Sequence, residues 1–262
     1  MSTLLNVLSI QWRELKQARS FYTALALGIP LFIYTGIFMD LQWNAYQLVA
    51  VDYITTSEPN LFISQWAFGY FVILFCLCYT SGAILMLNKT GEFTSLLFSK
   101  PISREKFFLY LISGTTLLIM IPFVLLHLSF WINFGILDQV WSPYIWLSLL
   151  GLLAPCLLIV SSISFFSFIS GSGVFPTIVY CFIFPFIFGE KEKFLYPLAD
   201  NNIYRGLIDF IDLFLPNFGD LLMFSGNIFA QQPYQLSINT LGIPYIVILL
   251  GISFFLFKRK NI

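Results

Sequence analysis

Few residues of this chain have the side chains and the spacing that chemistry at a protein site requires. The single histidine, His127, lies in a long run without charged residues, where an ionisable group is a candidate for function. Such a residue can also be a neutral imidazole that hydrogen-bonds to a neighbouring helix, and the sequence leaves both interpretations open. Residues two apart on a helix do not share a face, so the nearest cysteine pair is expected to pack rather than to bind a metal. The four cysteines are Cys76, Cys78, Cys156 and Cys181.

Short motif matches near residue 90 do not form a complete active site. Lys89-Thr-Gly91 and Ser103-Arg-Glu-Lys106 resemble parts of penicillin-binding active sites, but they occur in the wrong order and without an S-D-N element. The sequence contains no G-x-x-x-x-G-K-[ST], H-E-x-x-H, G-x-S-x-G or G-x-G-x-x-G motif. Its long apolar runs also lack the buried charged residues that ion-coupled carriers use. Any active transport must therefore take its energy from a partner.

The elements that position these residues are apolar and long. The chain is 58% apolar and 10% charged, with a mean hydropathy of +0.85, whereas about a quarter of a soluble domain is charged. A bilayer core takes about 20 apolar residues per helix, so the uncharged run at 139–189 holds two helices, separated by the turn-forming Ser170-Gly-Ser-Gly173. We predict an all-α membrane protein, a single transmembrane domain over 1–262. Its six spans are about 21–39, 62–87, 107–134, 144–168, 174–188 and 241–257.

Basic residues are unevenly distributed between the two sides of these spans. Three of the thirteen fall between spans five and six, and ten fall on the other side. The positive-inside rule then places both termini and the 88–106 loop in the cytoplasm. The ten are Arg13, Lys16, Arg19, Lys89, Lys100, Arg104, Lys106, Lys258, Arg259 and Lys260, and the three are Lys191, Lys193 and Arg205.

Two flanking segments have helical periodicity outside the spans. Residues 3–19 predict a basic amphipathic helix in the cytoplasmic interface, with Trp12 at headgroup depth. The large outer loop, 189–240, predicts a helix that Pro216 ends, and a second one from Asp220 to Phe224. These outer-leaflet helices either cap the bundle or gate an exit path. The apolar stripes are Leu4, Leu5, Leu8, Trp12 and Leu15 in the first segment, and Ile203, Leu207, Phe210, Ile211 and Phe214 in the second.

The 88–106 loop combines basic residues with three consecutive apolar ones, Leu96, Leu97 and Phe98. The apolar residues suit an apolar cleft on a cytoplasmic partner, and the basic residues suit acidic groups around such a cleft. A loop that only retained the positive charge inside would not need the apolar residues.

Residues 92–107, Glu-Phe-Thr-Ser-Leu-Leu-Phe-Ser-Lys-Pro-Ile-Ser-Arg-Glu-Lys-Phe, resemble the signature that follows the second span in type 2 ABC-transporter permeases. The rest of the chain resembles this family in its architecture alone. Leu215-Pro-Asn-Phe218 also resembles permeases found beside copper-enzyme maturation systems.

The resemblance implies the permease subunit of an ABC exporter in the plasma (inner) membrane, and not an enzyme. Two permeases, identical or paired with a sister chain, would lie among membrane lipids and bind two separate ATPase chains. Those chains would hold the ATP and Mg²⁺, and this chain would bind no cofactor and no nucleic acid. The expected coupling helix that docks on the ATPase comprises Glu92, Leu96, Leu97, Phe98, Lys100, Pro101, Ile102, Ser103 and Arg104.

Two other classes of protein stay open at this point. A membrane-embedded enzyme would need polar groups that converge at membrane depth, and the sequence gives His127 no obvious carboxylate or serine partner. A structural membrane scaffold without transport activity would need no site of its own.

Overall fold

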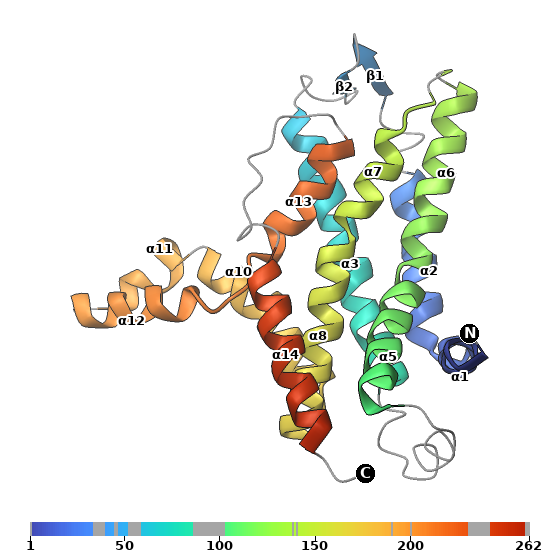
Figure 1. The fold of residues 1–262 in the computed structure, drawn as a ribbon. Helices are drawn as coiled ribbons and strands as arrows, with labels where there is room; N and C mark the ends of the chain where they lie inside the picture. Colours follow the sequence, from blue (N-terminus) through green and yellow to red (C-terminus); the bar gives the residue numbers. More distant parts are fainter. Residues whose placement is uncertain are drawn as a thin grey trace.

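The computed structural model describes residues 2–33, 40–44, 47–51, 59–85, 103–137, 139, 141–189, 191–199, 201–229 and 242–259. Within these residues the chain is predominantly helical (Figure 1). Three helices are long and apolar enough to cross a membrane, at Ala67–Leu85, Arg104–Ile136 and Tyr144–Ser170. A fourth span exists if the bent pair Val174–Gly189 and Lys191–Leu198 is counted as one. The prediction of a helical, membrane-embedded protein is confirmed at this level.

The N-terminal part contains three helices and one element that the sequence did not predict. Helix α1 (Ser2–Gln17) meets α2 (Arg19–Ile33) at Ala18, and α3 (Pro59–Leu85) runs along the bundle. The predicted first span coincides with α2 as far as Ile33, and its last residues, 34–39, lie outside the described residues. Strands β1 (Asp40–Asn44) and β2 (Gln47–Val51) form an antiparallel pair with Asp40 opposite Val51. Apart from this short pair, the described elements are all helices.

Two of the long spans are each made of two helices in succession. Helices α5 (Arg104–Ile119) and α6 (Ile121–Leu137) meet at Met120, and α7 (Tyr144–Gly151) and α8 (Leu153–Ser170) meet at Leu152. Each second helix has a proline, Pro122 or Pro155, in its first turn. A proline is tolerated there because the missing N–H would have no partner within that helix. The breaks thus follow from the sequence without interrupting either span.

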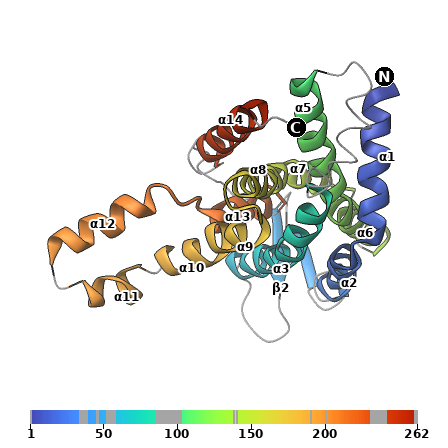
Figure 2. The ribbon, with the colours of Figure 1, turned by 90° about the horizontal axis from the view of Figure 1, so that it is seen from below.

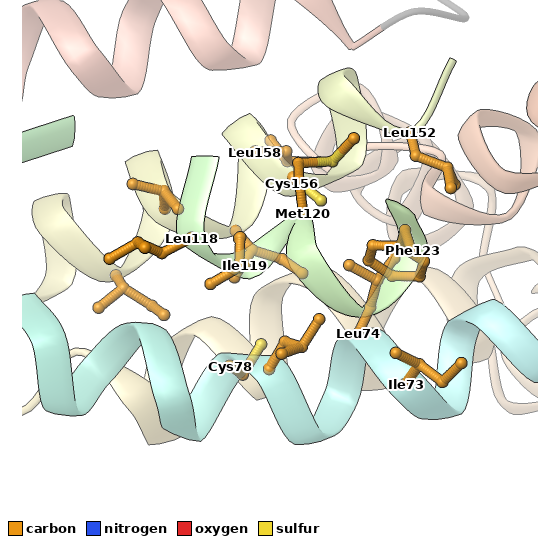
Figure 3. Packing of buried hydrophobic residues seen from close by; sticks show 14 of the residues in the cluster. Ile73, Leu74, Cys78, Leu118, Ile119, Met120, Phe123, Leu152, Cys156 and Leu158 are labelled. Atoms are coloured by element: carbon orange, nitrogen blue, oxygen red, sulfur yellow. The ribbon is translucent and has the colours of Figure 1, made fainter. Parts of the chain in front are cut away.

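The apolar core lies where α3 crosses these two spans. Figure 3 shows Leu74 and Cys78 of α3 in one cluster with Phe123 of α6 and Cys156 of α8. The thiols of Cys78, Cys156 and Cys181 are free, and all three residues are fully buried. They pack as small apolar residues, as expected from their place in the spans.

The predicted break after the fourth span is confirmed. Helix α8 ends at Ser170, and Gly171 follows with a φ of 73°, a left-handed conformation that suits glycine. The chain then runs through α9 (Val174–Ile178), a π-helical turn (Val179–Ile183) and α10 (Phe184–Gly189). These three segments together cover the predicted span at 174–188.

The segment between α10 and the last helix differs from the predicted outer cap. Helix α11 (Lys191–Phe194), a 3₁₀ turn (Tyr196–Leu198) and α12 (Asn202–Asp212) project sideways from the bundle (Figure 2). Helix α12 ends at Asp212, four residues before the proline that we expected to end it.

The second helix predicted in the outer loop is also placed differently. Helix α13 (Phe218–Phe229) packs between α3 and α7 rather than lying on a leaflet. Its buried residues Phe218, Leu221, Leu222, Ser225 and Phe229 follow one another at helical spacing, so a whole face of the helix is covered. The last helix, α14 (Ile243–Arg259), packs against α8. It corresponds to the predicted span at 241–257, shifted by two residues towards the C-terminus.

Candidate functional site

The predicted docking site lies mostly beyond what the structure describes. Its residues Glu92, Leu96, Leu97, Phe98, Lys100, Pro101 and Ile102 are outside the described residues, and Ser103 and Arg104 are within them. The described chain on either side of this loop, the end of α3 and the start of α5, lies at one end of the bundle (Figure 1). The structure therefore shows how the C-terminal end of the loop is attached to the bundle.

Ser103 and Arg104 begin helix α5. The Ser103 hydroxyl oxygen accepts a hydrogen bond from the backbone N–H of Lys106 at 3.4 Å, which caps the helix. Glu105 follows in the first turn, where a carboxylate is favourable to the helix dipole. The guanidinium of Arg104 donates to the carbonyl of Lys258 at 3.5 Å, and the Lys258 amine lies 3.3 Å from the Glu105 carboxylate. The start of α5 is thereby tied to the end of α14.

Helix α1 is attached to α5 by a buried amide rather than lying free in the interface. The Gln11 side chain donates to the carbonyl of Leu111 at 2.9 Å and to the Thr115 hydroxyl oxygen at 3.0 Å. Gly114 permits this contact, because a Cβ there would overlap the Gln11 amide oxygen. Gln11 is 1% exposed although it is polar, and no apolar pattern could predict that.

The face of α1 that packs on the bundle differs from the predicted stripe. The buried residues are Val7, Gln11 and Leu15, and Trp12 is exposed with the Lys16 amine 5.5 Å from its ring centroid. The exposed position of Trp12 is compatible with the predicted contact with lipid headgroups. Among the stripe residues whose side chains the structure describes, which are Leu8, Trp12 and Leu15, only Leu15 is fully buried.

Most of the described basic residues are on elements at the end of the bundle where the loop is anchored. This end contains α1, the start of α5 and the end of α14 (Figure 1). The three basic residues of the predicted outer side are on α11 and α12, which project from the side of the bundle. The basic residues on elements at the anchored end are Arg13, Lys16, Arg19, Arg104, Lys106, Lys258 and Arg259.

His127 does have a serine partner, which the sequence did not reveal. Its Nε2 lies 3.0 Å from the hydroxyl of Ser148 on α7, and its Nδ1 lies 2.7 Å from the Phe123 carbonyl. Because a carbonyl can only accept, we assign the ring proton to Nδ1, which leaves Nε2 as an acceptor that faces the Ser148 hydroxyl. The ring also stacks on Tyr70 of α3, with centroids 5.8 Å apart. Ser148 follows His127 by 21 residues and lies on a different helix, so helical periodicity in the sequence could not indicate this contact.

This polar cluster joins four helices. The Ser148 hydroxyl donates to the Ile145 carbonyl at 2.7 Å, so this carbonyl competes with Nε2 of His127 for the single serine proton. The Ser225 hydroxyl of α13 donates to the backbone carbonyl of Ser148 at 2.7 Å. His127, Ser148, Tyr70 and Ser225 are all fully buried. A serine that faces an imidazole has the arrangement of a nucleophile and its base. Here the cluster is closed to a substrate and connects α3, α6, α7 and α13 by hydrogen bonds.

A cleft of about 430 Å³ lies between α10, the α12–α13 connection and the start of α14. Two tyrosines hold that connection, since Tyr180 donates to the Phe214 carbonyl and Tyr245 to the Leu213 carbonyl, each at 2.9 Å. Asp220 lines the cleft, and its partial burial raises the pKa of this carboxyl. The cleft therefore combines apolar walls with an acidic group at the junction of the projecting helices and the bundle.

Comparison with known proteins does not add a relative to this description. No protein-family model matches the chain, and no curated protein or solved structure matches it. The two places that stand out on their own geometry are the anchored end of the 88–106 loop and the buried cluster around His127. The sequence pointed to both, although it missed Gln11, Ser148 and Ser225 as the side chains that join helices there.

Proposed function

We propose that the chain is the membrane-spanning permease subunit of an ATP-driven ABC exporter, coupled to separate ATPase chains through the 88–106 loop. It would cross the plasma (inner) membrane six times, with both termini in the cytoplasm. The spans would be α2, α3, α5–α6, α7–α8, α9–α10 and α14. The charge distribution described above supports this orientation.

The observation that supports the proposal most strongly is the attachment of the loop to the bundle. At its exit, α5 is tied to α14 through Arg104, Glu105 and Lys258, and to α1 through Gln11. A force applied to the loop would therefore reach three helices together. This is what a coupling element requires, and a loop that only retained charge would not require it.

In the proposed mechanism, closure of the ATPases moves the two loops of a permease pair together. The permeases then rock between inward-open and outward-open arrangements. The substrate would move along the interface between the two permeases. Apolar, aromatic walls with few charges would suit a lipid-like or apolar cargo.

Charge reversal in the loop tests the proposal. We expect Arg104→Glu to reduce the amount of ATPase that co-purifies with the permease by tenfold or more, because about 1.4 kcal/mol of lost affinity has that effect. Leu97→Asp is expected to do the same by placing a charge in an apolar contact. The matched control is Arg13→Glu, the same change at an exposed position of α1 at the same end of the bundle. Undiminished co-purification and ATP turnover in both loop variants would refute the docking role.

A membrane-embedded hydrolase is the second candidate, and one observation favours it. The Ser148 hydroxyl lies 3.0 Å from Nε2 of His127, within reach for proton transfer. Full burial of both residues counts against it, because a substrate would need a route to them. Detergent-solubilised protein should therefore remain unlabelled by a fluorophosphonate, a reagent that phosphonylates activated serines with loss of fluoride.

A further inference from the structure

The outer arm, which we define as residues 191–199 and 201–214, leaves the bundle sideways and not along it. The helices at Val174–Gly189 and Lys191–Leu198 meet at an angle of 70°. Figure 2 shows α11 and α12 extending away from the remaining helices. Because Figure 2 looks along the bundle from below, an arm that extends across this view lies towards the plane of a surrounding membrane.

The contacts inside the arm are polar. The Lys191 amine lies 2.7 Å from the Asp209 carboxylate and 2.9 Å from that of Asp212. The Tyr196 hydroxyl donates to Asp209 at 2.6 Å, and the Arg205 guanidinium lies 5.6 Å from the centroid of the Tyr196 ring. The Lys191 amine holds the pKa of Asp209 below its usual range, and the two carboxylates raise the pKa of Lys191. Asp209 therefore stays ionised and paired with Lys191 at neutral pH.

The opposite side of α12 is apolar and uncovered. Ile203 is 76% exposed, Leu207 54% and Phe210 57%, and these residues share one face at helical spacing. A helix pair in water buries its apolar faces and exposes its charged ones. The arm has the reverse arrangement, with ionic contacts between its segments and apolar side chains outside.

The depth of the arm follows from the length of α14. The arm is held at its base by Tyr245 in the first turn of α14, and the basic residue Arg259 ends the same helix. Fourteen residues of helix separate the two, a rise of about 21 Å. The hydrocarbon core of a bilayer is about 30 Å thick. If Arg259 lies at one headgroup boundary, the base of the arm lies within the opposite leaflet and not in the water beyond it.

We propose that the outer arm is a lipid-binding element that lies in the leaflet distal to Arg259, with the apolar face of α12 among the acyl chains. Its paired charges face the headgroups, and the pairing lowers the cost of placing them at this depth. The exposed apolar residues Ile183 and Phe186, on the span that leads into the arm, extend the same lipid-facing surface. The partner is the bilayer itself, so the lipid contact does not depend on an ATPase.

Spin labels on the two faces of α12 test this proposal in full-length protein. The protein would be reconstituted into vesicles of phosphatidylcholine and phosphatidylglycerol at a ratio of about three to one, a mixture that supplies the acyl chains and anionic headgroups. The background is Cys76→Ser, because the other cysteines are fully buried. Labels go to Leu207→Cys and Phe210→Cys on the apolar face, and to Arg205→Cys as the matched control on the polar face. Collision rates with oxygen, which enters lipid, and with a water-soluble nickel chelate give the depth of each label.

We expect the labels at 207 and 210 to lie about 5–10 Å below the headgroup boundary, and the label at 205 to collide mainly with the nickel chelate. Equal access of the chelate to all three labels would overturn the proposal. It would also be overturned if the labels at 207 and 210 showed spin–spin broadening that disappears on dilution with unlabelled chain. In that case a second copy, and not lipid, would cover the apolar face.

Discussion

His127→Ala is expected to lower the free energy of unfolding by about 3 kcal/mol or more. The substitution leaves a cavity at a fully buried position and removes the imidazole that meets Ser148 of α7 and the ring of Tyr70 of α3. The loss is expected because the side chain joins α6 to both α7 and α3. Chemical unfolding in detergent micelles measures it.

Leu128→Ala is the control for this experiment, since Leu128 is the next residue on α6 and is partly exposed. We expect it to cost less than half as much as the histidine substitution, because an exposed site leaves no closed cavity. An unchanged stability of His127→Ala, together with the loss of a hydrolytic activity, would instead assign the imidazole to catalysis.

Gly151→Leu is expected to separate α13 from α7 and to cost about 1–3 kcal/mol, the usual cost of overpacking a well-packed contact. A Cβ at position 151 would lie 3.2 Å from the Cα of Ser225, and a backbone atom cannot move aside as the end of a side chain can. The hydrogen bond from Ser225 to the Ser148 carbonyl would be lost with the displacement. Thermal unfolding and hydrogen exchange of the α13 amides measure both effects.

The matched control is Gly251→Leu on α14, where no atom lies within 4 Å of a Cβ. Leucine is a better helix former than glycine, so this variant is expected to be as stable as the parent or slightly more so. Equal stability of the two leucine variants would show that α13 does not pack against α7 at Gly151.

The spans could be predicted because the bilayer imposes a simple rule on length and charge. The runs at 62–87, 107–134 and 144–168 coincide with α3, α5–α6 and α7–α8, and the glycine turn after Ser170 falls where it was predicted. Prolines near the breaks, Pro122 and Pro155, altered the helices locally without shortening the spans. For these elements, apolarity and turn chemistry were sufficient.

The positions of α12 and α13 could not be predicted in the same way. Both are apolar on one face, and periodicity alone does not tell whether that face meets lipid or protein. The small residue Ser225 of α13, which faces Gly151 of α7, allows the close approach that draws α13 into the bundle. Helix α12 presents large side chains instead and stays outside.

The polar contacts of the candidate sites were also beyond the reach of sequence patterns. Gln11 meets Leu111 and Thr115, about a hundred residues away, and His127 meets Ser148 on a different helix. Each contact depends on how two helices are placed relative to one another. Sequence showed that His127 was unusual, and the fold supplied its partner.

The contact made by the 88–106 loop is the central claim, and a photo-cross-linking amino acid at Leu97 in the full-length protein tests it most directly. Irradiation of native membranes, followed by mass spectrometry, identifies what the residue touches. We predict a cross-link to a separate chain that carries a P-loop nucleotide site, with less cross-linking when Arg104→Glu is present. Cross-links only to lipid or to other residues of the same chain would contradict the proposed role of the loop.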